Sequence, residues 1–240
     1  MATKIAVMTD VHANLPALQA ALSAIKLEGY DLLVHTGDAI AIGPYPAETL
    51  DLLLSIPDIM LVMGNHDAWF ADGLPEPRPD WMSEREYAHQ QWTNAAIDPH
   101  VRAAVGQWPY LIEQEIEGVR LTFLHYSLAA SGGGFAPIIQ HANTEELDGL
   151  FASYDSHLIF YGHHHPFSDL QGRARYINPG SLGCYTKAEA RYTLVTLQNG
   201  RWNIEHRSAP YDDTALFEAF QTHNVPEREF LCRTFLNHLE

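Results

Sequence analysis

Residues 4–16 read Lys-Ile-Ala-Val-Met-Thr-Asp-Val-His-Ala-Asn-Leu-Pro, and this stretch sets the pattern of the fold. Its first six residues form a short apolar run that is typical of a buried strand. Asp10 and His12 follow that run, and Asn14 suits the N-cap of a helix. Apolar residues then recur at helical spacing at Leu15, Leu18, Leu22 and Ile25. The stretch therefore predicts a strand, a polar loop and a helix.

The same unit recurs in the next fifty residues. Residues 31–35 predict a second strand that is followed by Gly37 and Asp38, and residues 47–55 predict a second helix. A third predicted strand, residues 59–63, leads into Gly-Asn-His-Asp at residues 64–67. Strands and helices that alternate, with polar residues after the strands, predict an α/β sheet with its site outside the carboxyl ends of the strands.

Two later strands also end in histidines. Residues 119–124 lead into His125, and residues 157–161 lead into Gly-His-His-His at residues 162–165. Each imidazole carries a donor and an acceptor, which makes it costly to bury without partners but a good metal ligand. If this loop is extended, His163 and His165 face one site while His164 points elsewhere. A solvated, histidine-rich turn is the alternative interpretation.

Three other segments complete the predicted architecture of a single domain spanning residues 1–240. Residues 68–108 predict a helical insertion over the site, and residues 212–240 predict a helical tail with a break near Pro226. The aromatic residues of the insertion either fill a small satellite core or offer a stacking wall for a nucleobase or another ring. Trp69 and Phe70, close to Asp67, are the candidates for such a substrate contact. Residues 131–134, rich in glycine, predict a flexible loop beside His125 that gates access.

Composition narrows the range of partners. The net charge is −16, from 30 acidic and 14 basic residues, which disfavours polymeric nucleic acid and anionic membranes. A small phosphorylated ligand remains compatible, because bound cations would dominate the local field. No apolar run reaches membrane-spanning length and the first residues lack a signal region, so we expect a cytoplasmic protein. Cys184 and Cys232 are expected to be reduced thiols without a chemical role.

Five segments end in residues that bind metal ions. A lone histidine is more often structural, but five such segments after successive strands favour a metal centre. Carboxylates, an amide oxygen and imidazoles without thiolate suit Mn²⁺, Fe or Zn²⁺ better than a structural zinc site. The ligands suffice for two ions if one carboxylate bridges them, and Asp38 is the candidate bridge. The residues concerned are Asp10, His12, Asp38, Asn65, His66, His125, His163 and His165.

These motifs resemble the motif series of the calcineurin-like metallophosphoesterases, from Asp10 to His165. Residues 14–18, 43–46 and 178–181 are further similar to a bacterial subgroup of small phosphodiesterases and phosphatases. The resemblance implies a two-sheet αββα sandwich with a binuclear metal centre at its edge. It also implies that His66 is the proton donor and that two ligand sets exist. The sets are Asp10, His12, Asp38 and His165 for one ion, and Asp38, Asn65, His125 and His163 for the other.

The expected function is therefore a metal-dependent phosphoesterase that hydrolyses a phosphodiester, a nucleotide pyrophosphate or another phosphate ester. Its expected cofactors are two divalent ions with a bridging hydroxide; Mn²⁺ is the first choice and Fe, Zn²⁺ or Ni²⁺ are alternatives. The expected partner is a small phosphorylated molecule, with a nucleotide as one option.

Two other functions remain open at this stage. A Ser/Thr-type protein phosphatase is disfavoured because the arginines of its second and third motifs are absent after Asp38 and before Gly64. The acid that would orient His66 is also missing at position 41, which leaves Asp67 or His35 to orient ligands. The other alternative is a catalytically silent, metal-bound ligand sensor, and the presence of His66 argues against it.

Overall fold

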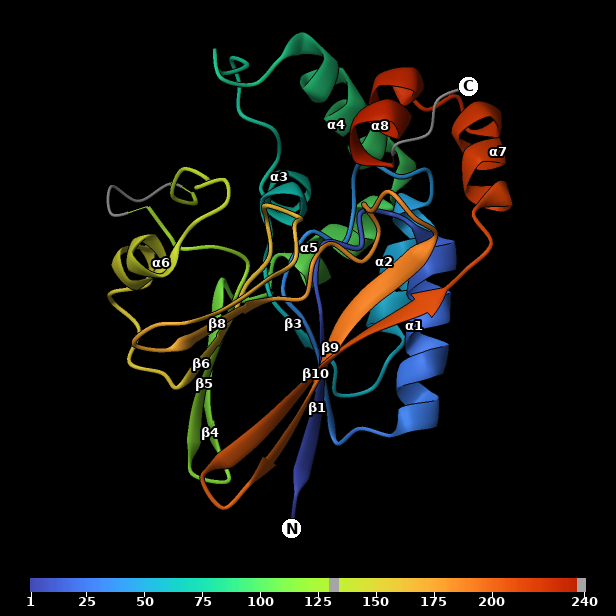
Figure 1. Ribbon diagram of the computed structural model, residues 1–240. Coiled ribbons are helices and arrows are strands. Elements are labelled where there is room, and N and C mark those ends of the chain that lie inside the picture. The colour runs from blue at the N-terminus through green and yellow to red at the C-terminus, as the bar shows by residue number, and fades with distance from the viewer. Residues whose placement is uncertain (130–133, 237–240) are drawn as a thin grey trace.

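Two five-stranded sheets form the centre of the fold in the computed structural model, which describes residues 1–129 and 134–236 (Figure 1). The first sheet has the order β10-β9-β1-β2-β3, in which β1, β2 and β3 are parallel and β9 and β10 are antiparallel to their neighbours. Its strands are β1 (Thr3–Met8), β2 (Leu32–His35), β3 (Met60–Leu61), β9 (Glu189–Gln198) and β10 (Arg201–Pro210).

The second sheet has the order β4-β5-β6-β8-β7, with a parallel centre and an antiparallel strand at each edge. Its strands are β4 (Leu111–Ile116), β5 (Val119–Leu124), β6 (Leu158–Phe160), β7 (Ser168–Gln171) and β8 (Arg175–Asn178). The edge strand β7 has no counterpart in the sequence prediction. The strand predicted over residues 59–63 is reduced to the two residues of β3.

The alternation of side chains along β1 explains the layers. Ile5 and Val7 face the second sheet and join the apolar core between the two sheets. Ala6 and Met8 face the opposite way and pack under α1 (Leu15–Glu28) and α2 (Pro46–Leu54), which cover the outer face of the first sheet (Figure 1). On the outer face of the second sheet lies α6 (Thr144–Leu150). The predicted αββα sandwich is confirmed.

Local sequence signals explain two of the connections. The Asn14 side chain accepts a hydrogen bond from the Ala17 backbone N–H at 3.1 Å, so Asn14 caps α1 as expected. Asn199 and Gly200, with φ angles of 50° and 74°, join β9 to β10. Two successive positive φ values are what a two-residue hairpin turn of this hand requires.

Helices occupy most of the segment between β3 and β4 and the end of the chain. They are α3 (Asn65–Ala71), α4 (Glu84–Ala96), the 3₁₀ helix Pro99–Val101, α5 (Arg102–Val105), α7 (Thr214–Thr222) and α8 (Arg228–Phe235). Leu216, Phe220 and Leu231 of the tail pack with Ile42 and Cys184, so the tail covers loops that follow the central strands. None of the helices in the described ranges is long and apolar enough to cross a membrane.

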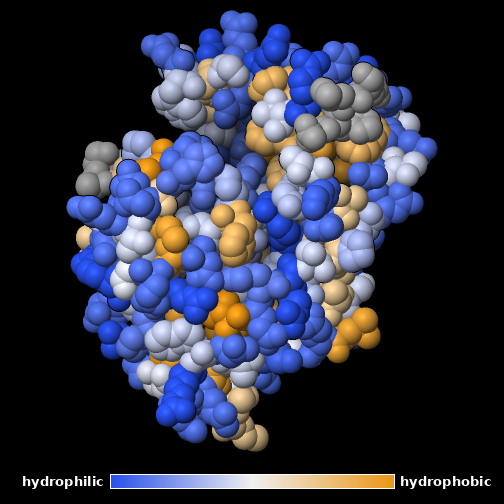
Figure 2. Space-filling view, in the orientation of Figure 1, coloured by the Kyte–Doolittle hydropathy of each residue, from blue (hydrophilic) through white to orange (hydrophobic). Residues whose placement is uncertain are grey.

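The surface is hollowed beneath the lobe that carries α4 (Figure 2). Apolar residues on the face shown there lie scattered among hydrophilic ones. The first three residues of the loop predicted over residues 131–134 lie outside the described residues.

Candidate metal centre

All seven predicted metal ligands lie at one edge of the sandwich. They follow the carboxyl ends of β1, β2, β3, β5 and β6. Those ends converge because β1, β2 and β3 run parallel in the first sheet and β5 and β6 run parallel in the second. The side chains divide into two clusters that share Asp38. The grouping is the one that the resemblance implies.

The first cluster surrounds Nε2 of His12. This atom lies 2.9 Å from Nε2 of His165, 3.7 Å from Oδ1 of Asp10 and 3.9 Å from Oδ2 of Asp38. The second nitrogen, Nε2 of His165, lies 3.9 Å from the same oxygen of Asp10. Two imidazoles and two carboxylates therefore converge on one small volume.

The second cluster surrounds Nε2 of His125. Its neighbours are Nδ1 of His163 at 3.1 Å, Oδ1 of Asn65 at 3.2 Å and Oδ2 of Asp38 at 3.2 Å. Two imidazoles, one amide oxygen and one carboxylate thus converge here. Oδ2 of Asp38 belongs to both clusters.

Hydrogen bonds on the far side of two rings test whether these clusters fit a cation. Nδ1 of His12 faces the carbonyl of Ile40 at 3.2 Å, and Nδ1 of His125 faces the carbonyl of Thr36 at 2.9 Å. A carbonyl only accepts, so each Nδ1 carries a proton, and each ring presents a lone pair at Nε2 once that nitrogen is deprotonated. Those lone pairs face other acceptors, which is the arrangement that a metal ion satisfies. The residues present fit divalent metal ions.

The charges of the two clusters also favour a cation. Burial lowers the pKa of His125, but the neighbouring Asp38 and Asp10 outweigh this effect and raise it to about 9. Burial raises the pKa of Asp10 to about 7, with His125 opposing and Asp38 adding to the effect. Protons therefore supply the positive charge that the carboxylates attract, and a metal ion would compete with them.

This competition predicts that metal affinity increases with pH. Below pH about 7 both Asp10 and His125 hold protons that a metal ion must displace, and above about 9 neither does. The apparent affinity for Mn²⁺ should therefore rise between about pH 6 and 9, by up to about tenfold per pH unit for each proton displaced. Equilibrium dialysis of the protein against Mn²⁺ at several pH values measures the slope, and an affinity that is independent of pH would contradict the prediction.

The backbone is strained where it presents the ligands. Five of the seven ligand residues have positive φ, namely Asp10 at 52°, His12 at 49°, Asp38 at 58°, His163 at 72° and His165 at 67°. Such conformations are unfavourable for residues other than glycine and occur mostly at functional sites. The loops are therefore shaped for the positions of these side chains.

The loop at residues 162–165 is not extended, so the condition for His163 and His165 to face one site is not met. The N–H of His164 donates to the carbonyl of Gly162 at 2.9 Å, which makes a tight turn, and the flanking histidines are left-handed. As a result His163 and His165 enter different clusters. His164 points away and stacks on Tyr161, with ring centroids 5.5 Å apart.

Two glycines allow the close approach of the carboxylate loops. A Cβ at Gly64 would lie 2.2 Å from Oδ1 of Asp38, and a Cβ at Gly162 would lie 2.7 Å from Oδ2 of Asp10. Any side chain at either position would displace a ligand carboxylate.

Asp67 supports the loop that carries Asp38. It accepts hydrogen bonds from the backbone N–H groups of Asp38 at 2.8 Å, Ala39 at 3.0 Å and Gly64 at 3.0 Å. This buried carboxylate therefore fixes two ligand loops against each other. His35 was the other expected support, and this expectation is wrong, because its buried ring nitrogens have no hydrogen-bond partner among the described residues.

The motif at residues 178–181 braces the loop of His163 and His165. Nδ2 of Asn178 donates to the carbonyl of Gly162 at 3.1 Å, and Oγ of Ser181 donates to the carbonyl of Asp10 at 2.8 Å. The motif thus positions ligands from behind without contacting the metal sites.

His66 lies beside the clusters and is held by a residue that sequence reasoning missed. Its Nε2 is 4.0 Å from Oδ2 of Asp38, and its Nδ1 is 2.8 Å from Oε1 of the buried Gln90 on α4. Nε2 of Gln90 donates to Oδ1 of Asn94 at 3.2 Å, and Nδ2 of Asn94 donates to the carbonyl of Trp69 at 3.0 Å. Because this carbonyl only accepts, the direction of every bond in the chain is set, and Nδ1 of His66 must be the protonated nitrogen.

This chain of hydrogen bonds predicts a positioning role for Gln90. Gln90→Met keeps a similar volume but removes the acceptor, so we expect kcat to fall by about 10- to 100-fold with unchanged metal content. Gln90→Glu keeps an oxygen acceptor and should retain more activity than Gln90→Met. Steady-state kinetics, metal analysis and melting temperatures measure these effects, and equal losses in both variants would indicate a packing role instead.

Cys184 lies closer to the metal centre than the sequence indicates. Its sulfur belongs to a group with the ring nitrogens of His12 and His165 in which all ligand atoms lie within 4.8 Å of one another. Burial raises the pKa of the Cys184 thiol well above its ordinary value, so the neutral thiol is favoured. The only signal in the sequence is its position three residues after Ser181.

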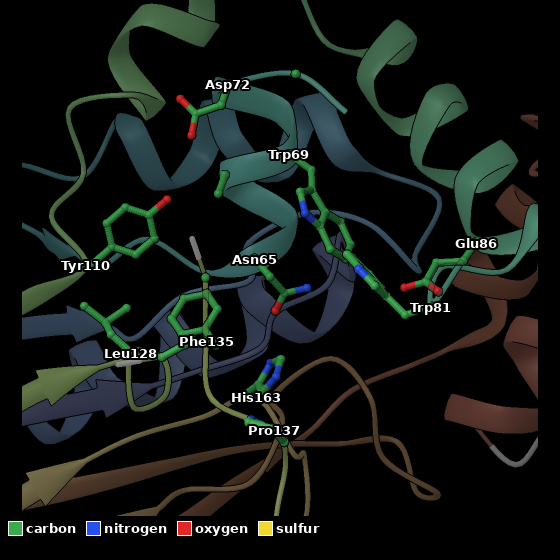
Figure 3. A pocket seen from close by; sticks show the side chains of 14 residues that line it. Asn65, Trp69, Asp72, Trp81, Glu86, Tyr110, Leu128, Phe135, Pro137 and His163 are labelled. Carbon is green, nitrogen blue, oxygen red and sulfur yellow. The ribbon is translucent and has the colours of Figure 1, made fainter. Parts of the chain in front are cut away.

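The two candidate substrate residues have different environments. Phe70 is fully buried in an apolar core cluster, so it offers no face to a ligand and the expectation that it contacts substrate is wrong. Trp69 instead lines a cavity of about 1040 Å³ that also borders Asn65 and His163 (Figure 3). Its ring lies edge to face against His66, with centroids 4.9 Å apart.

The sandwich and its two clusters of histidines and carboxylates define a protein of the metal-dependent hydrolase type. The family model for the calcineurin-like phosphoesterase superfamily domain matches residues 3–200. The chain therefore belongs to this superfamily. An uncharacterized protein of Methanocaldococcus jannaschii is 27% identical to this chain over 239 residues. The match covers 93% of this chain and 94% of that protein.

Solved structures share the fold at low sequence identity. A hypothetical protein from Pyrococcus horikoshii OT3 matches with a TM-score of 0.79 and 16% identity over 99% of this chain and all of the other. A metallophosphoesterase from Sphaerobacter thermophilus matches with a TM-score of 0.70 and 21% identity over 95% and 96% of the two chains. Vacuolar Protein Sorting 29 from Cryptosporidium parvum matches with a TM-score of 0.52 and 13% identity over 87% and 98%.

Proposed function

We propose that this protein is a metal-dependent phosphoesterase that hydrolyses a small phosphodiester or nucleotide phosphate ester with two divalent ions. The observation that carries the proposal is the position of His66. Its Nε2 lies 4.0 Å from the carboxylate oxygen of Asp38 that both ligand clusters share, and its other nitrogen is held by Gln90. A ring so placed is suited to transfer a proton at the metal centre.

The proposed ligand sets are those of the two clusters. Asp10, His12, Asp38 and His165 would hold one ion, and Asp38, Asn65, His125 and His163 would hold the other. Such ions would polarise phosphoryl oxygens, lower the pKa of a water between them and neutralise charge in an in-line displacement. Oxygen and imidazole ligands favour Mn²⁺, with Fe, Zn²⁺ and Ni²⁺ as alternatives.

His66 would act on the leaving group. Gln90 accepts a hydrogen bond from Nδ1, so the protonated ring directs its second proton, on Nε2, towards the centre. An alkoxide is a poor leaving group, and protonation of its oxygen by His66 removes the need to expel it as an anion. Asp67 and the motif at residues 178–181 keep the ligand loops in place during this step.

Vacuolar Protein Sorting 29 bears on the choice between an enzyme and a silent sensor. That protein is named for sorting rather than hydrolysis and has a related fold, so the fold alone does not select an enzyme. The hydrogen-bonded His66 favours turnover, because it lies outside both proposed ligand sets and its bond to Gln90 directs Nε2 towards the centre. A protein phosphatase is the weaker alternative, since the arginines of its motifs are absent.

The test is turnover by the purified protein. It should hydrolyse bis(p-nitrophenyl) phosphate when loaded with Mn²⁺ and lose this activity after chelation, with recovery when Mn²⁺ is restored. Asp38→Asn serves as the inactive control, purified in the same way. An absence of metal-dependent turnover across diesters, monoesters and nucleotides would favour the sensor instead.

A further inference from the structure

A cavity of about 1040 Å³ borders the second cluster, and under the proposed mechanism it would receive the leaving group. Asn65 and His163 border it at the metal centre, and Trp69 connects it to His66 through the edge-to-face contact of their rings. A proton donor faces the oxygen of the group that leaves. The cavity is therefore on the side of the alcohol part of the ester.

Aromatic rings line opposite sides of this cavity (Figure 3). Trp69 and Trp81 stack with centroids 6.0 Å apart and an interplanar angle of 30°, and they form one side. Tyr110 and Phe135, whose centroids are 5.9 Å apart, belong to the other side. Aromatic faces carry negative electrostatic potential and attract cations, most strongly for Trp and Tyr.

The carboxylates are the charged groups among the described residues that line the cavity. Asp72 and Glu86 are among its lining residues, and neither forms an ion pair with another described residue. None of the described residues that line the cavity is Lys or Arg. Both carboxylates are exposed, and a second phosphate or a carboxylate on the leaving group would meet repulsion from them.

The arginines of the helical insertion form contacts outside the cavity. Arg78 contacts the carbonyl of Met82 and Glu84, and Arg85 pairs with Glu227 at 3.3 Å. Arg102 donates to the carbonyl of Phe70 and covers its ring at 4.8 Å. The acidic and aromatic character of the cavity is therefore not offset by a neighbouring cation.

We propose that this cavity binds the alcohol part of the substrate and that this alcohol carries an alkylammonium group, such as that of an amino alcohol. The proposal rests on the proposed phosphoesterase function and specifies its substrate class. The two metal ions would receive the single phosphoryl group, while the aromatic rings, Asp72 and Glu86 would receive the cation. Trp69 lies between these two regions and is expected to contribute most.

The test compares two diesters that differ in one atom. Methyl choline phosphate and methyl 3,3-dimethylbutyl phosphate have leaving groups of the same shape, but the first carries a quaternary nitrogen where the second carries carbon. We expect KM for the choline ester to be about tenfold lower, which is the factor expected for a cation held by aromatic rings and carboxylates. Equal KM values, or a lower KM for the neutral ester, would overturn the proposal.

The two esters differ in intrinsic reactivity, but this difference is the same for every variant of the protein. A change in preference between variants therefore reports recognition of the leaving group by the cavity. Trp69→Leu and Glu86→Gln should reduce the preference for the choline ester by several-fold, whereas Trp69→Phe should retain part of it. Glu84→Gln is the matched control, because Glu84 lies on the same first turn of α4 and is exposed but does not line the cavity. A preference that is unchanged in Trp69→Leu and Glu86→Gln would overturn the proposal.

Binding measurements keep this test separate from the proposed function. Calorimetry with the Mn²⁺-loaded protein compares the affinities of the two esters even where neither is hydrolysed. Turnover of other diesters without a preference for the choline ester would reject the alkylammonium substrate and leave the phosphoesterase intact. Preferential binding of the choline ester without any turnover would support the cavity and reject the catalytic function.

Discussion

Asp38→Asn is expected to reduce the metal content of the protein from about two ions per chain to one or none and to abolish metal-dependent turnover. One oxygen of Asp38 belongs to both ligand clusters, at 3.2 Å from Nε2 of His125 and 3.9 Å from Nε2 of His12. The variant keeps an oxygen at this place but removes its charge. Two cations held close together would then repel each other with less neutralisation.

The choice of Asn over Ala follows from the backbone. Asp38 has a φ of 58°, a conformation that is less unfavourable for Asn than for Ala, so Asn isolates the effect of the charge better. Asp58→Asn is a matched control, because Asp58 is exposed, has a φ of 57° and lies outside both clusters. Metal analysis by mass spectrometry compares the two variants. Full occupancy in Asp38→Asn would reject the shared carboxylate.

The sequence is sufficient to predict the fold and the convergence of the candidate ligands because these residues are tied to strand ends. Asp10, Asp38 and His125 each come within a few residues of a buried strand, and parallel strands bring their carboxyl ends together. The continuous apolar run of β1 further predicts a strand packed on both faces. These features depend only on local sequence and on the regular geometry of sheets.

Other features depend on contacts between distant segments, which a single sequence does not specify. Gln90 reaches His66 from a helix of the insertion, 24 residues away, and no motif marks it. Cys184 approaches the first cluster only because the motif at residues 178–181 folds back on the loop of Asp10. The left-handed turn at His163 and His165 is likewise set by tertiary hydrogen bonds rather than by residue preference.

The tail shows a similar limit. Residues 212–240 have the spacing of a helix that packs, but the sequence does not indicate where. In the structure Leu216, Phe220 and Leu231 pack against Ile42 and Cys184, beside the loops that carry the first cluster. The tail therefore contributes to the stability of the site from the far end of the chain.

His66→Gln is expected to leave metal content unchanged and to reduce kcat by about 10²- to 10⁴-fold for esters with poor leaving groups. His66 belongs to neither proposed ligand set, and Gln fills much of the same space while removing the proton that the imidazolium would supply. The loss should be small for a nitrophenyl leaving group, whose anion is stable enough to depart unaided.

A series of methyl phosphate diesters with leaving groups of increasing pKa tests this prediction. For the native protein log kcat should depend weakly on leaving-group pKa, and for His66→Gln it should fall steeply, so the two lines diverge as the leaving group becomes poorer. Parallel lines would show that His66 positions the substrate or stabilises charge instead of donating a proton. Metal analysis of the same samples checks that both proteins hold the same number of ions. The two slopes can be compared only if they do.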